Sequence, residues 1–383
     1  MLTRSKIRLF NITEINGTNQ FLELRHEWNK LLERSRDKNI FLTWEYLSTY
    51  WKHFGKDKKL RILCIEDKNE IIAIAPLRQS RLGFASPLGY EVIEPLGYRG
   101  LMPEGADYTG LILAEREAEC LQLFLDYLVE HNDWDFIYLY DVPGTSIIPD
   151  LLAKMSGTIP ITFELEKGVI CPYISVPDSV DIFMKGLSKS FRYNLRRYMQ
   201  KLESDYQRVE LKSYENFGSV EEAMKIYFEL HQKRWKSQDM PGVFSTQEVR
   251  DFYIAVAKLF AEKGWLALYF LMADDEPIST QYCFQYNRKT YYALAGFDPN
   301  YSKYSPGNLI TLKIIEKCIE RKIEEYDLLK GGEAYKFDWT NKYRVNLSIR
   351  LTNNRFITNV YNFGIRTLKR VKMDKILGFL NSP

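Results

Sequence analysis

The sequence has few of the residues from which proteins build metal sites and disulfide frameworks. Its 383 residues include four histidines and five cysteines, all isolated, and neither an HExxH nor a CxxC motif occurs. Zinc sites and disulfide-rich folds need such residues at close, regular spacing. We therefore expect no metal site, and we interpret the cysteines as buried thiols.

An excess of one charge and long apolar runs are also missing. Lys and Arg number 53 and Asp and Glu 50, so the net charge of +3 excludes a strongly basic nucleic-acid binder. The longest stretch without a charged residue, Pro277–Asn287, is far shorter than the roughly 20 apolar residues of a membrane-spanning helix. The first residues lack the apolar segment of a secretory signal. These absences predict a cytoplasmic protein.

Common nucleotide-binding and hydrolase motifs do not occur either. The sequence contains no GxGxxG after a strand, no GxxxxGK[ST] and no GxSxG. These motifs cradle phosphates or present a nucleophilic serine on a tight turn. Their absence argues against a Rossmann dehydrogenase, a P-loop enzyme and an α/β-hydrolase.

What the sequence does contain is a repeated pattern of helices and strands. Residues 41–79 and 244–285 both begin with Phe-x-Thr, continue as a helix and lead into two apolar strands separated by an acidic turn. In each half a further amphipathic helix, 117–132 or 306–322, leads into another strand. Helices inserted among strands in this order indicate an α/β fold with a mixed sheet.

The second predicted unit, residues 173–383, differs from the first, residues 1–172, by two basic segments. Residues 185–201 carry six positive charges and no acid, and a basic C-terminal helix is expected after Phe356. Apolar residues recur at helical spacing in both segments, so each is expected to be an amphipathic helix with a basic outer face. A solvated face is the simplest interpretation; an anionic ligand, an anionic membrane surface and RNA are the alternatives. We place the boundary between the units within residues 166–179.

A helix start near Ser305 has the features of an anion site. A strand over 290–297 leads through a loop into a helix that begins Ser305, Pro306, Gly307. Serine is a favoured N-cap, proline suits the first helical position, and glycine leaves the first turn without a side chain. Free N–H groups and the positive end of the helix dipole would then face a pyrophosphate. Many helices begin in this way, so the motif alone identifies no ligand.

The residues around this helix resemble those of the CelD-like acetyltransferases, a branch of the GNAT superfamily related to the FemAB transferases. The matching segments are GFD at 296–298, YSPG at 304–307, YK and Trp at 335–339, and the basic stretch 190–203. The resemblance covers about residues 41–339, and in the N-terminal half it is limited to the order of elements. It implies a tandem duplicated GNAT fold, an α/β fold of mixed twisted sheets flanked by helices.

The resemblance also implies transfer of an acyl group from acetyl-CoA or another acyl-CoA to an amine, directly in a ternary complex and without a metal. The pyrophosphate would lie at the helix start, and the strand before it would hold the pantetheine and the thioester. The residues expected to bind the cofactor are Ser305, Pro306, Gly307, Asn308, Ala295 and Phe297.

Catalytic and acceptor-binding residues are expected just beyond the strand that follows this helix. Asp327 is the first choice as the base, with Glu333 next, and Tyr335 is the expected acid toward the thiolate. A strand-end cap for Asp327 and simple packing for Tyr335 are the structural alternatives. The residues expected to contact the acceptor are Lys336, Trp339, Arg192 and Arg196.

The expected acceptor is an amino sugar or another anionic or carrier-linked small metabolite of polysaccharide or cell-envelope biosynthesis. The N-terminal unit, which lacks the YSPG and YK segments, would bind substrate or support the fold. Two other functions remain open: a FemAB-type transferase that uses aminoacyl-tRNA, and a non-catalytic scaffold of an exopolysaccharide machinery at the inner face of the membrane. The FemAB-type enzymes usually carry a long helical arm, for which the sequence shows no heptad pattern. No specific nucleic-acid partner is expected.

Overall fold

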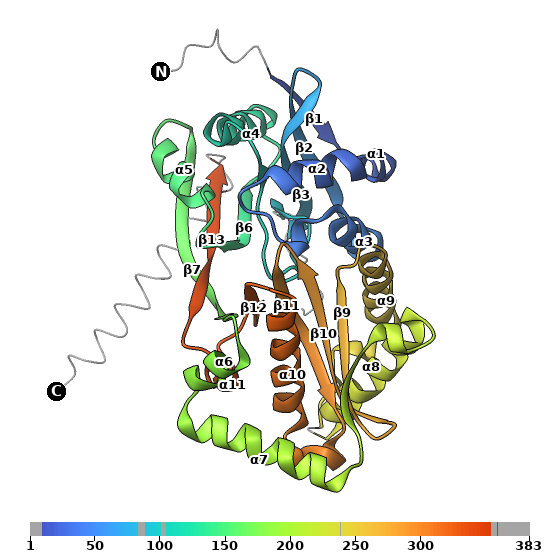
Figure 1. The fold of residues 1–383 in the computed structure, drawn as a ribbon. Coiled ribbons are helices and arrows are strands. Elements are labelled where there is room, and N and C mark those ends of the chain that lie inside the picture. Colours follow the sequence, from blue (N-terminus) through green and yellow to red (C-terminus); the bar gives the residue numbers. More distant parts are fainter. Residues whose placement is uncertain (1–9, 83–88, 101–104, 238, 354–357, 359–383) are drawn as a thin grey trace, which may run out of the picture.

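The computed structural model describes residues 10–82, 89–100, 105–237, 239–353 and 358, and the predicted basic C-terminal helix lies outside them. The described strands form one thirteen-stranded sheet in the order β1-β2-β3-β4-β6-β13-β7-β12-β11-β10-β9-β8, with β5 paired to β3 (Figure 1). The strands of the N-terminal half are β1 (Asn11–Ile15), β2 (Lys59–Asp67), β3 (Glu70–Leu82), β4 (Tyr90–Pro95), β5 (Ile112–Leu113), β6 (Phe136–Pro143) and β7 (Ile161–Ser175). Those of the C-terminal half are β8 (Val209–Ser213), β9 (Leu266–Ala273), β10 (Glu276–Tyr286), β11 (Lys289–Phe297), β12 (Glu325–Asp327) and β13 (Tyr343–Asn353).

The strand pairing repeats from one half to the other, which confirms the predicted tandem GNAT fold. In each half a short edge strand, β1 or β8, lies antiparallel to the first of three antiparallel strands. The third of these, β4 or β11, then pairs in parallel with the strand that follows a helix, β6 or β12. The acidic turns predicted between the paired apolar strands connect β2 to β3 and β9 to β10.

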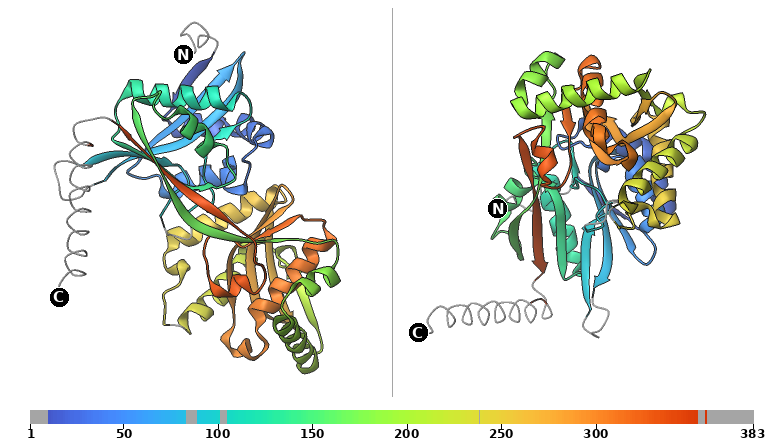
Figure 2. Two further views of the ribbon diagram at one scale, coloured as in Figure 1. Left: turned by 90° about the vertical axis from the view of Figure 1, so that its left-hand side faces the viewer. Right: turned by 90° about the horizontal axis from the view of Figure 1, so that it is seen from below.

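The last strand of each half pairs with the other half. β7 ends the N-terminal half, but its residues Tyr173–Ser175 pair with β12 of the C-terminal half. β13 ends the C-terminal half and lies between β6 and β7. Figure 2 shows these two long strands running between the two lobes. The predicted boundary at residue 172 therefore falls inside β7, and the segment 343–353 completes the N-terminal part of the sheet.

Helices cover both faces of the sheet. Those of the N-terminal half are α1 (Thr18–Glu23), α2 (Arg25–Arg34), α3 (Trp44–Phe54), α4 (Glu117–His131) and α5 (Ile148–Met155). Those of the C-terminal half are α6 (Val180–Gly186), α7 (Lys189–Asp205), α8 (Val220–Lys236), α9 (Gln247–Glu262), α10 (Pro306–Glu320) and α11 (Ala334–Phe337). Short 3₁₀ turns are η2 (Ile40–Leu42), η3 (Tyr214–Asn216), η4 (Val243–Ser245) and η5 (Pro299–Tyr304). None of the helices in the described ranges has the length and apolar character needed to cross a bilayer.

The two halves share a hydrophobic core. Helices α3 and α9 pack against each other, and Phe252 of α9 contacts Tyr46 and Phe54 of α3 with ring centroids 5.8 and 5.1 Å apart. One cluster of buried side chains therefore runs through both halves, from Trp28 to Phe284. Burial of large aromatic side chains stabilises the folded state by several kcal/mol in total. This core therefore fixes the two halves relative to each other.

The predicted basic helix over 185–201 is two helices. α6 ends at Gly186, and α7 begins at Lys189 after an extended connection. The Oγ of Ser188 accepts a hydrogen bond from the backbone N–H of Phe191, which is the N-cap arrangement that starts a new helix. Lys185 therefore lies on α6, and the other five charges of the segment lie on α7.

Candidate active site

A cleft opens in the C-terminal half of the sheet where β11 and β12 separate. The two strands are paired only through Lys289–Tyr291 of β11. Beyond that point Tyr292–Phe297 has no strand on this side among the described residues, and a register shift against β10 leaves Ala293 in a bulge. Unpaired backbone groups at such an edge can hydrogen-bond an extended ligand that contains amides.

Two adjoining cavities occupy this cleft and share Arg234, Tyr292, Ala295 and Tyr335 in their walls. The first, which we call the helix cavity, has a volume of about 320 Å³ and lies against the start of α10. The second, the central cavity, has a volume of about 620 Å³ and lies between the two halves. Small-molecule sites typically enclose about 300–1,000 Å³, so each cavity can hold part of a ligand.

The helix cavity brings together the residues predicted to bind coenzyme A. The predicted residues in its wall are Ser305, Pro306, Gly307, Asn308, Ala295, Phe297, Tyr335 and Trp339. The N–H of Gly307 makes no backbone hydrogen bond within the described ranges, and a Cβ added at Gly307 would meet no atom within 4 Å. An anionic group can therefore approach the positive end of the α10 dipole at this residue.

The start of α10 differs in one respect from the prediction. Ser305 occupies the cap position but has left-handed backbone angles (φ 52°, ψ 54°), and its side chain accepts no capping hydrogen bond. Because a proline disfavours the right-handed helical region for the residue before it, η5 does not continue through Ser305 into α10. The Ser305 carbonyl accepts the N–H groups of Asn308 (3.0 Å) and Leu309 (3.2 Å). Among the first N–H groups of the helix, that of Gly307 is therefore the one left for a ligand.

Arg234 supplies a positive charge where the two cavities meet, and the sequence analysis did not single it out. Its guanidinium lies 5.5 Å from the ring centre of Phe297 and 5.9 Å from that of Trp235. Its Nε is buried and has no hydrogen-bond partner, and no acidic partner occurs in the described part of the chain. Because a buried donor without an acceptor is costly, this arrangement fits an anionic or carbonyl-bearing ligand.

The central cavity contains two carboxylates from the N-terminal half. Nζ of Lys330 lies 3.0 Å from Oδ2 of Asp141 and 3.9 Å from Oδ1 of Asp107. Burial raises the pKa of Asp107 to about 6; the charge of Asp141 adds to the increase, and that of Lys330 opposes it. A carboxylate in a cleft that titrates near neutral pH is a candidate general base. Asp107 was not predicted, because the resemblance of the N-terminal half was limited to the order of its elements.

His231 adds a neutral ring to the wall of the central cavity. Its Nε2 accepts a hydrogen bond of 2.9 Å from Nε1 of Trp235. Burial lowers the pKa of His231 to about 3, with the nearby Arg234 contributing. The ring is therefore neutral at pH 7 and carries its proton on Nδ1, which has no partner among the described residues.

Of the predicted residues around α11, Tyr335 lines both cavities, whereas Glu333 and Lys336 line the central cavity. Burial raises the pKa of the Tyr335 hydroxyl, so it holds its proton at neutral pH and can donate it. Lys336 is 2 % exposed. Its Nζ lies 3.0 Å from Oε2 of Glu333 and donates to the backbone carbonyls of Leu329, Lys330 and Gly331. The Lys336 ammonium therefore holds the loop after β12 in place, which leaves it little capacity for an acceptor.

Replacing Lys336 with methionine should open this loop. The stem would still pack, but the carbonyls of the loop would lose their buried donor, and each lost hydrogen bond costs about 1–3 kcal/mol. We expect a lower urea midpoint and faster proteolysis near Gly331, with Lys313→Met, on the outer side of α10, as the matched control. A variant as stable and as protease-resistant as wild type would show that Lys336 does not hold the loop.

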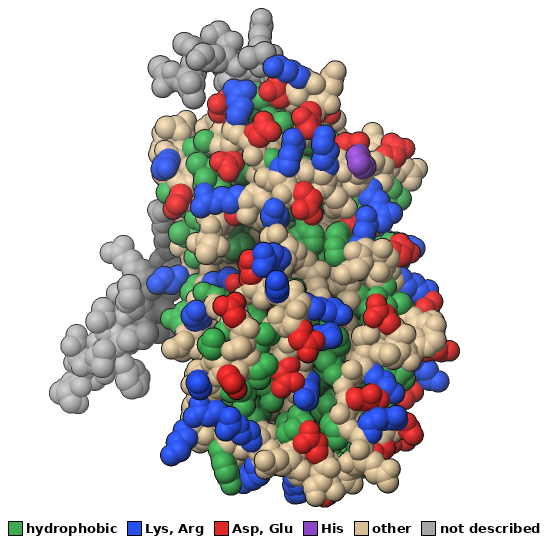
Figure 3. Space-filling view, viewed as in Figure 1, with side chains coloured by type: hydrophobic (Ala, Val, Ile, Leu, Met, Phe, Trp, Pro, Cys, Tyr) green, Lys and Arg blue, Asp and Glu red, His purple; other side chains and the backbone are tan. Residues whose placement is uncertain are grey.

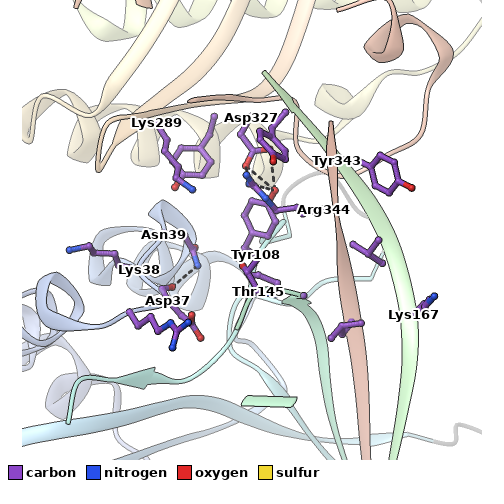
Figure 4. Close-up of a pocket in the computed structure, with 17 residues that line it drawn as sticks. Asp37, Lys38, Asn39, Tyr108, Thr145, Lys167, Lys289, Asp327, Tyr343 and Arg344 are labelled. Atoms are coloured by element: carbon purple, nitrogen blue, oxygen red, sulfur yellow. Dashed lines mark hydrogen bonds and ion pairs between the residues drawn. The ribbon is translucent and has the colours of Figure 1, made fainter. Parts of the chain in front are cut away.

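Asp327, the first predicted base, lies away from the cleft. It borders a separate cavity of about 570 Å³ between the halves (Figure 4). Its side chain is fully buried and accepts hydrogen bonds from Tyr108 (2.8 Å), Arg344 (2.7 Å) and the backbone N–H of Leu329 (2.9 Å). Three donors occupy most of the acceptor positions of this carboxylate, and its side chain is fully buried. The geometry therefore favours the structural alternative for Asp327, a cap that joins β12 to β13.

The structure also places the two predicted arginines of the basic segment outside these cavities. Nη1 of Arg192 donates to the carbonyls of Met184 (3.0 Å) and Lys185 (3.3 Å) at the end of α6. Arg196 is exposed on α7 and lines none of the cavities described above. Trp339, in contrast, is buried between Phe183 of α6 and Phe191 of α7, with ring centres 6.2 and 4.9 Å away.

Comparison with known proteins shows a similarity in the C-terminal half and a shared fold over nearly the whole chain. Residues 189–337 match a family model described as an acetyltransferase (GNAT) domain. This segment contains α10. It also contains the residues between β11 and α11 that line the two cavities. This part of the chain is therefore similar to acetyltransferases of the GNAT superfamily.

Solved structures match nearly the whole chain. FemX matches with a TM-score of 0.62 at 11 % identity, over 92 % of this chain and 99 % of FemX. A conserved protein from Bacteroides thetaiotaomicron matches with a TM-score of 0.56 at 10 % identity, over 90 % and 100 % of the two chains. L-PGS from Bacillus licheniformis matches with a TM-score of 0.52 at 10 % identity, over 90 % and 96 %. At these identities the matches establish the fold alone. No curated protein matches the sequence.

Proposed function

We propose that the protein is an acyl-CoA-dependent N-acyltransferase of the CelD-like branch, which transfers an acetyl or other acyl group directly to an amine. The observation that carries the proposal is the cleft between β11 and β12, which ends at the start of α10. There an unpaired strand edge, the free N–H of Gly307 and the unpartnered Nε of Arg234 line one continuous space.

The residues of the helix cavity fit coenzyme A. Gly307 and Arg234 would hold the pyrophosphate or the acyl carbonyl, and the free edge of Tyr292–Phe297 would pair with the pantetheine amides. Acyl-CoA supplies the activated acyl group as a thioester. Tyr335, which borders both cavities, would donate its hydroxyl proton to the departing thiolate.

We assign the base role to Asp107 rather than to Asp327. The acceptor amine must lose a proton to attack, and a carboxylate with a pKa of about 6 can accept it near neutral pH. Asp107 lies in the central cavity beside Lys330, whereas Asp327 borders the separate cavity. The N-terminal half would therefore take part in catalysis as well as in support of the fold.

An acceptor in the central cavity would meet aromatic rings and charges of both signs. Tyr98 and Tyr140 form a stacked pair with ring centres 4.1 Å apart in its wall, near Asp107, Asp141 and Arg234. Aromatic rings with mixed hydrogen-bonding groups suit a sugar, and the carboxylates suit its amino group. These features support an amino sugar or a carrier-linked amine of cell-envelope biosynthesis as the acceptor.

Titration of the protein with acetyl-CoA by calorimetry tests the proposal directly. We expect binding with a stoichiometry of one per chain, because the described helix cavity lies only in the C-terminal half. Release of free CoA should then increase when amino sugars or nucleotide-linked amino sugars are added. Absence of acetyl-CoA binding would contradict the proposal.

Aminoacyl transfer from tRNA is a second candidate, favoured by the likeness of the whole chain to FemX. Both candidates require a cleft in the C-terminal half, but they differ in the donor. Protection of the protein against thermal unfolding by acetyl-CoA, and none by aminoacyl-tRNA, would favour acyl-CoA; the reverse pattern would favour the FemAB-type reaction.

A further inference from the structure

An exposed basic surface covers one end of the molecule. On α7 the side chains of one stripe point away from the core at helical spacing, and α6 continues the stripe. We call this the α6–α7 surface, and its residues are Ile182, Lys185, Lys189, Tyr193, Arg196, Arg197 and Lys201. Figure 3 shows Lys and Arg side chains gathered at the end of the molecule where Figure 1 places these helices.

The charges of this surface are not neutralised by neighbours. No ion pair involves Lys185, Lys189, Arg196 or Arg197 in the described part of the chain. No acid occurs between Ile182 and Lys201. Several exposed cations elsewhere pair with acids, as in the contact of Lys317 with Glu320. The α6–α7 surface therefore carries a local positive field that the small net charge of the chain conceals.

Two large apolar side chains protrude from the same surface. Ile182 is 57 % exposed and Tyr193 is 63 % exposed, the two highest values among the large apolar side chains of the described residues. The opposite stripe, with Phe191, Leu195 and Leu202, is buried in the core. Exposed apolar side chains flanked by cations are the pattern of helices that lie on an anionic membrane surface.

The surface is also connected to the candidate active site. Trp339 lines the helix cavity and is packed between α6 and α7 through Phe183 and Phe191. A bilayer under the α6–α7 surface would therefore lie next to the helices that support the cleft.

We propose that the α6–α7 surface docks the protein on an anionic phospholipid bilayer. Charge complementarity provides the attraction, and insertion of Ile182 and Tyr193 among the headgroups adds apolar burial. RNA would satisfy the cations equally well, but it offers no apolar environment for Ile182. Docking does not depend on the proposed transferase activity; together the two would favour an acceptor attached to a lipid carrier.

Cosedimentation with vesicles tests the docking. The wild-type protein should bind vesicles of phosphatidylcholine mixed with phosphatidylglycerol, should not bind vesicles of phosphatidylcholine alone, and should be released by salt. A triple variant with Lys189→Glu, Arg196→Glu and Arg197→Glu should lose at least about tenfold in partition, because each cation near an anionic surface contributes about fivefold. The matched control carries the same charge change at exposed, unpaired Lys56, Lys154 and Lys225, and should lose far less.

A second pair of variants separates lipid from RNA. Ile182→Ser with Tyr193→Ser keeps every charge, so it should weaken vesicle binding while leaving any binding to a mixed tRNA sample unchanged. Equal vesicle binding by the basic-surface variant and its control would overturn the proposal. So would binding of tRNA together with no binding of anionic vesicles. Acetyl-CoA titration of the same variants reports separately on the proposed function and should give the wild-type affinity.

Discussion

Replacing Gly307 with glutamate should weaken binding of acetyl-CoA by far more than tenfold, at least about 1.4 kcal/mol. The added carboxylate would stand at the N–H group and the positive helix end that we assign to the pyrophosphate. Because a Cβ at Gly307 meets no atom within 4 Å, the side chain can extend into the cavity without disturbing the core. Calorimetric titration of both proteins with acetyl-CoA measures the difference.

Two controls make this result specific. Gly307→Gln has the same size without the charge and should have a smaller effect. Gly186→Glu adds the same charge at another glycine whose Cβ would meet no atom within 4 Å, and it should bind acetyl-CoA like the wild type. Arg234→Gln should act in the same direction as Gly307→Glu, since both residues line the helix cavity. Equal affinities for wild type and Gly307→Glu would falsify the placement of the cofactor.

Replacing Asp107 with asparagine should lower kcat by about 10²–10⁴ while leaving the affinity for acetyl-CoA almost unchanged. Asparagine keeps the shape of the side chain but cannot accept a proton. In the wild type, kcat/KM should rise with pH through a pKa of about 6, as Asp107 loses its proton, and the variant should lack this rise. Turnover assays over pH 5 to 8 with a competent amine acceptor measure both effects.

The same variant can be tested without an acceptor. The pKa of Asp107 is raised above its ordinary value of 3.8, so the folded protein binds this proton more tightly than the unfolded chain. The contribution of Asp107 to stability is therefore greatest below about pH 4 and is lost as the pH rises to about 6. Urea unfolding across this range should show a decline in the wild type that Asp107→Asn lacks.

Asp327→Asn provides the contrast. This change removes a carboxylate from the buried contact with Arg344 and Tyr108, so it should lower the unfolding midpoint. Any loss of activity should follow the loss of folded protein, without a change in the pH profile. A profile altered by Asp327→Asn and not by Asp107→Asn would return the base role to Asp327.

The sequence predicted the repeated elements well because periodicity and turn residues are local. The helix predicted over 117–132 is observed as Glu117–His131, and that predicted over 306–322 as Pro306–Glu320. The helix start at Pro306 could be predicted for the same reason, since proline fixes its own φ at a value that suits the first helical position. The break after Gly186 was missed, because a serine cap inside a continuous basic, amphipathic pattern gives a weak signal.

The parts of the site that come from distant segments could not be predicted in this way. Asp107 lines the central cavity because residues of both halves form its wall. The spacing of residues in the sequence does not indicate this contact between the halves. Arg234 could not be singled out either, because its place between Phe297 and Trp235 depends on how α8 crosses β11. The contacts of Asp327 could not be predicted for the same reason, because its partners Tyr108 and Arg344 come from other strands and loops.

The pairing of β13 with β6 has a consequence for synthesis on the ribosome. The N-terminal sheet lacks the strand beside β6 until Asn353 has been translated and has left the exit tunnel. The last residues of β7 likewise have no strand to pair with on this side until β12 has been synthesised. Until then the nascent chain would therefore hold an open sheet edge, a state that favours pairing with other chains. Final folding of this sheet would begin only after Asn353 has emerged, and it would join both halves in one step.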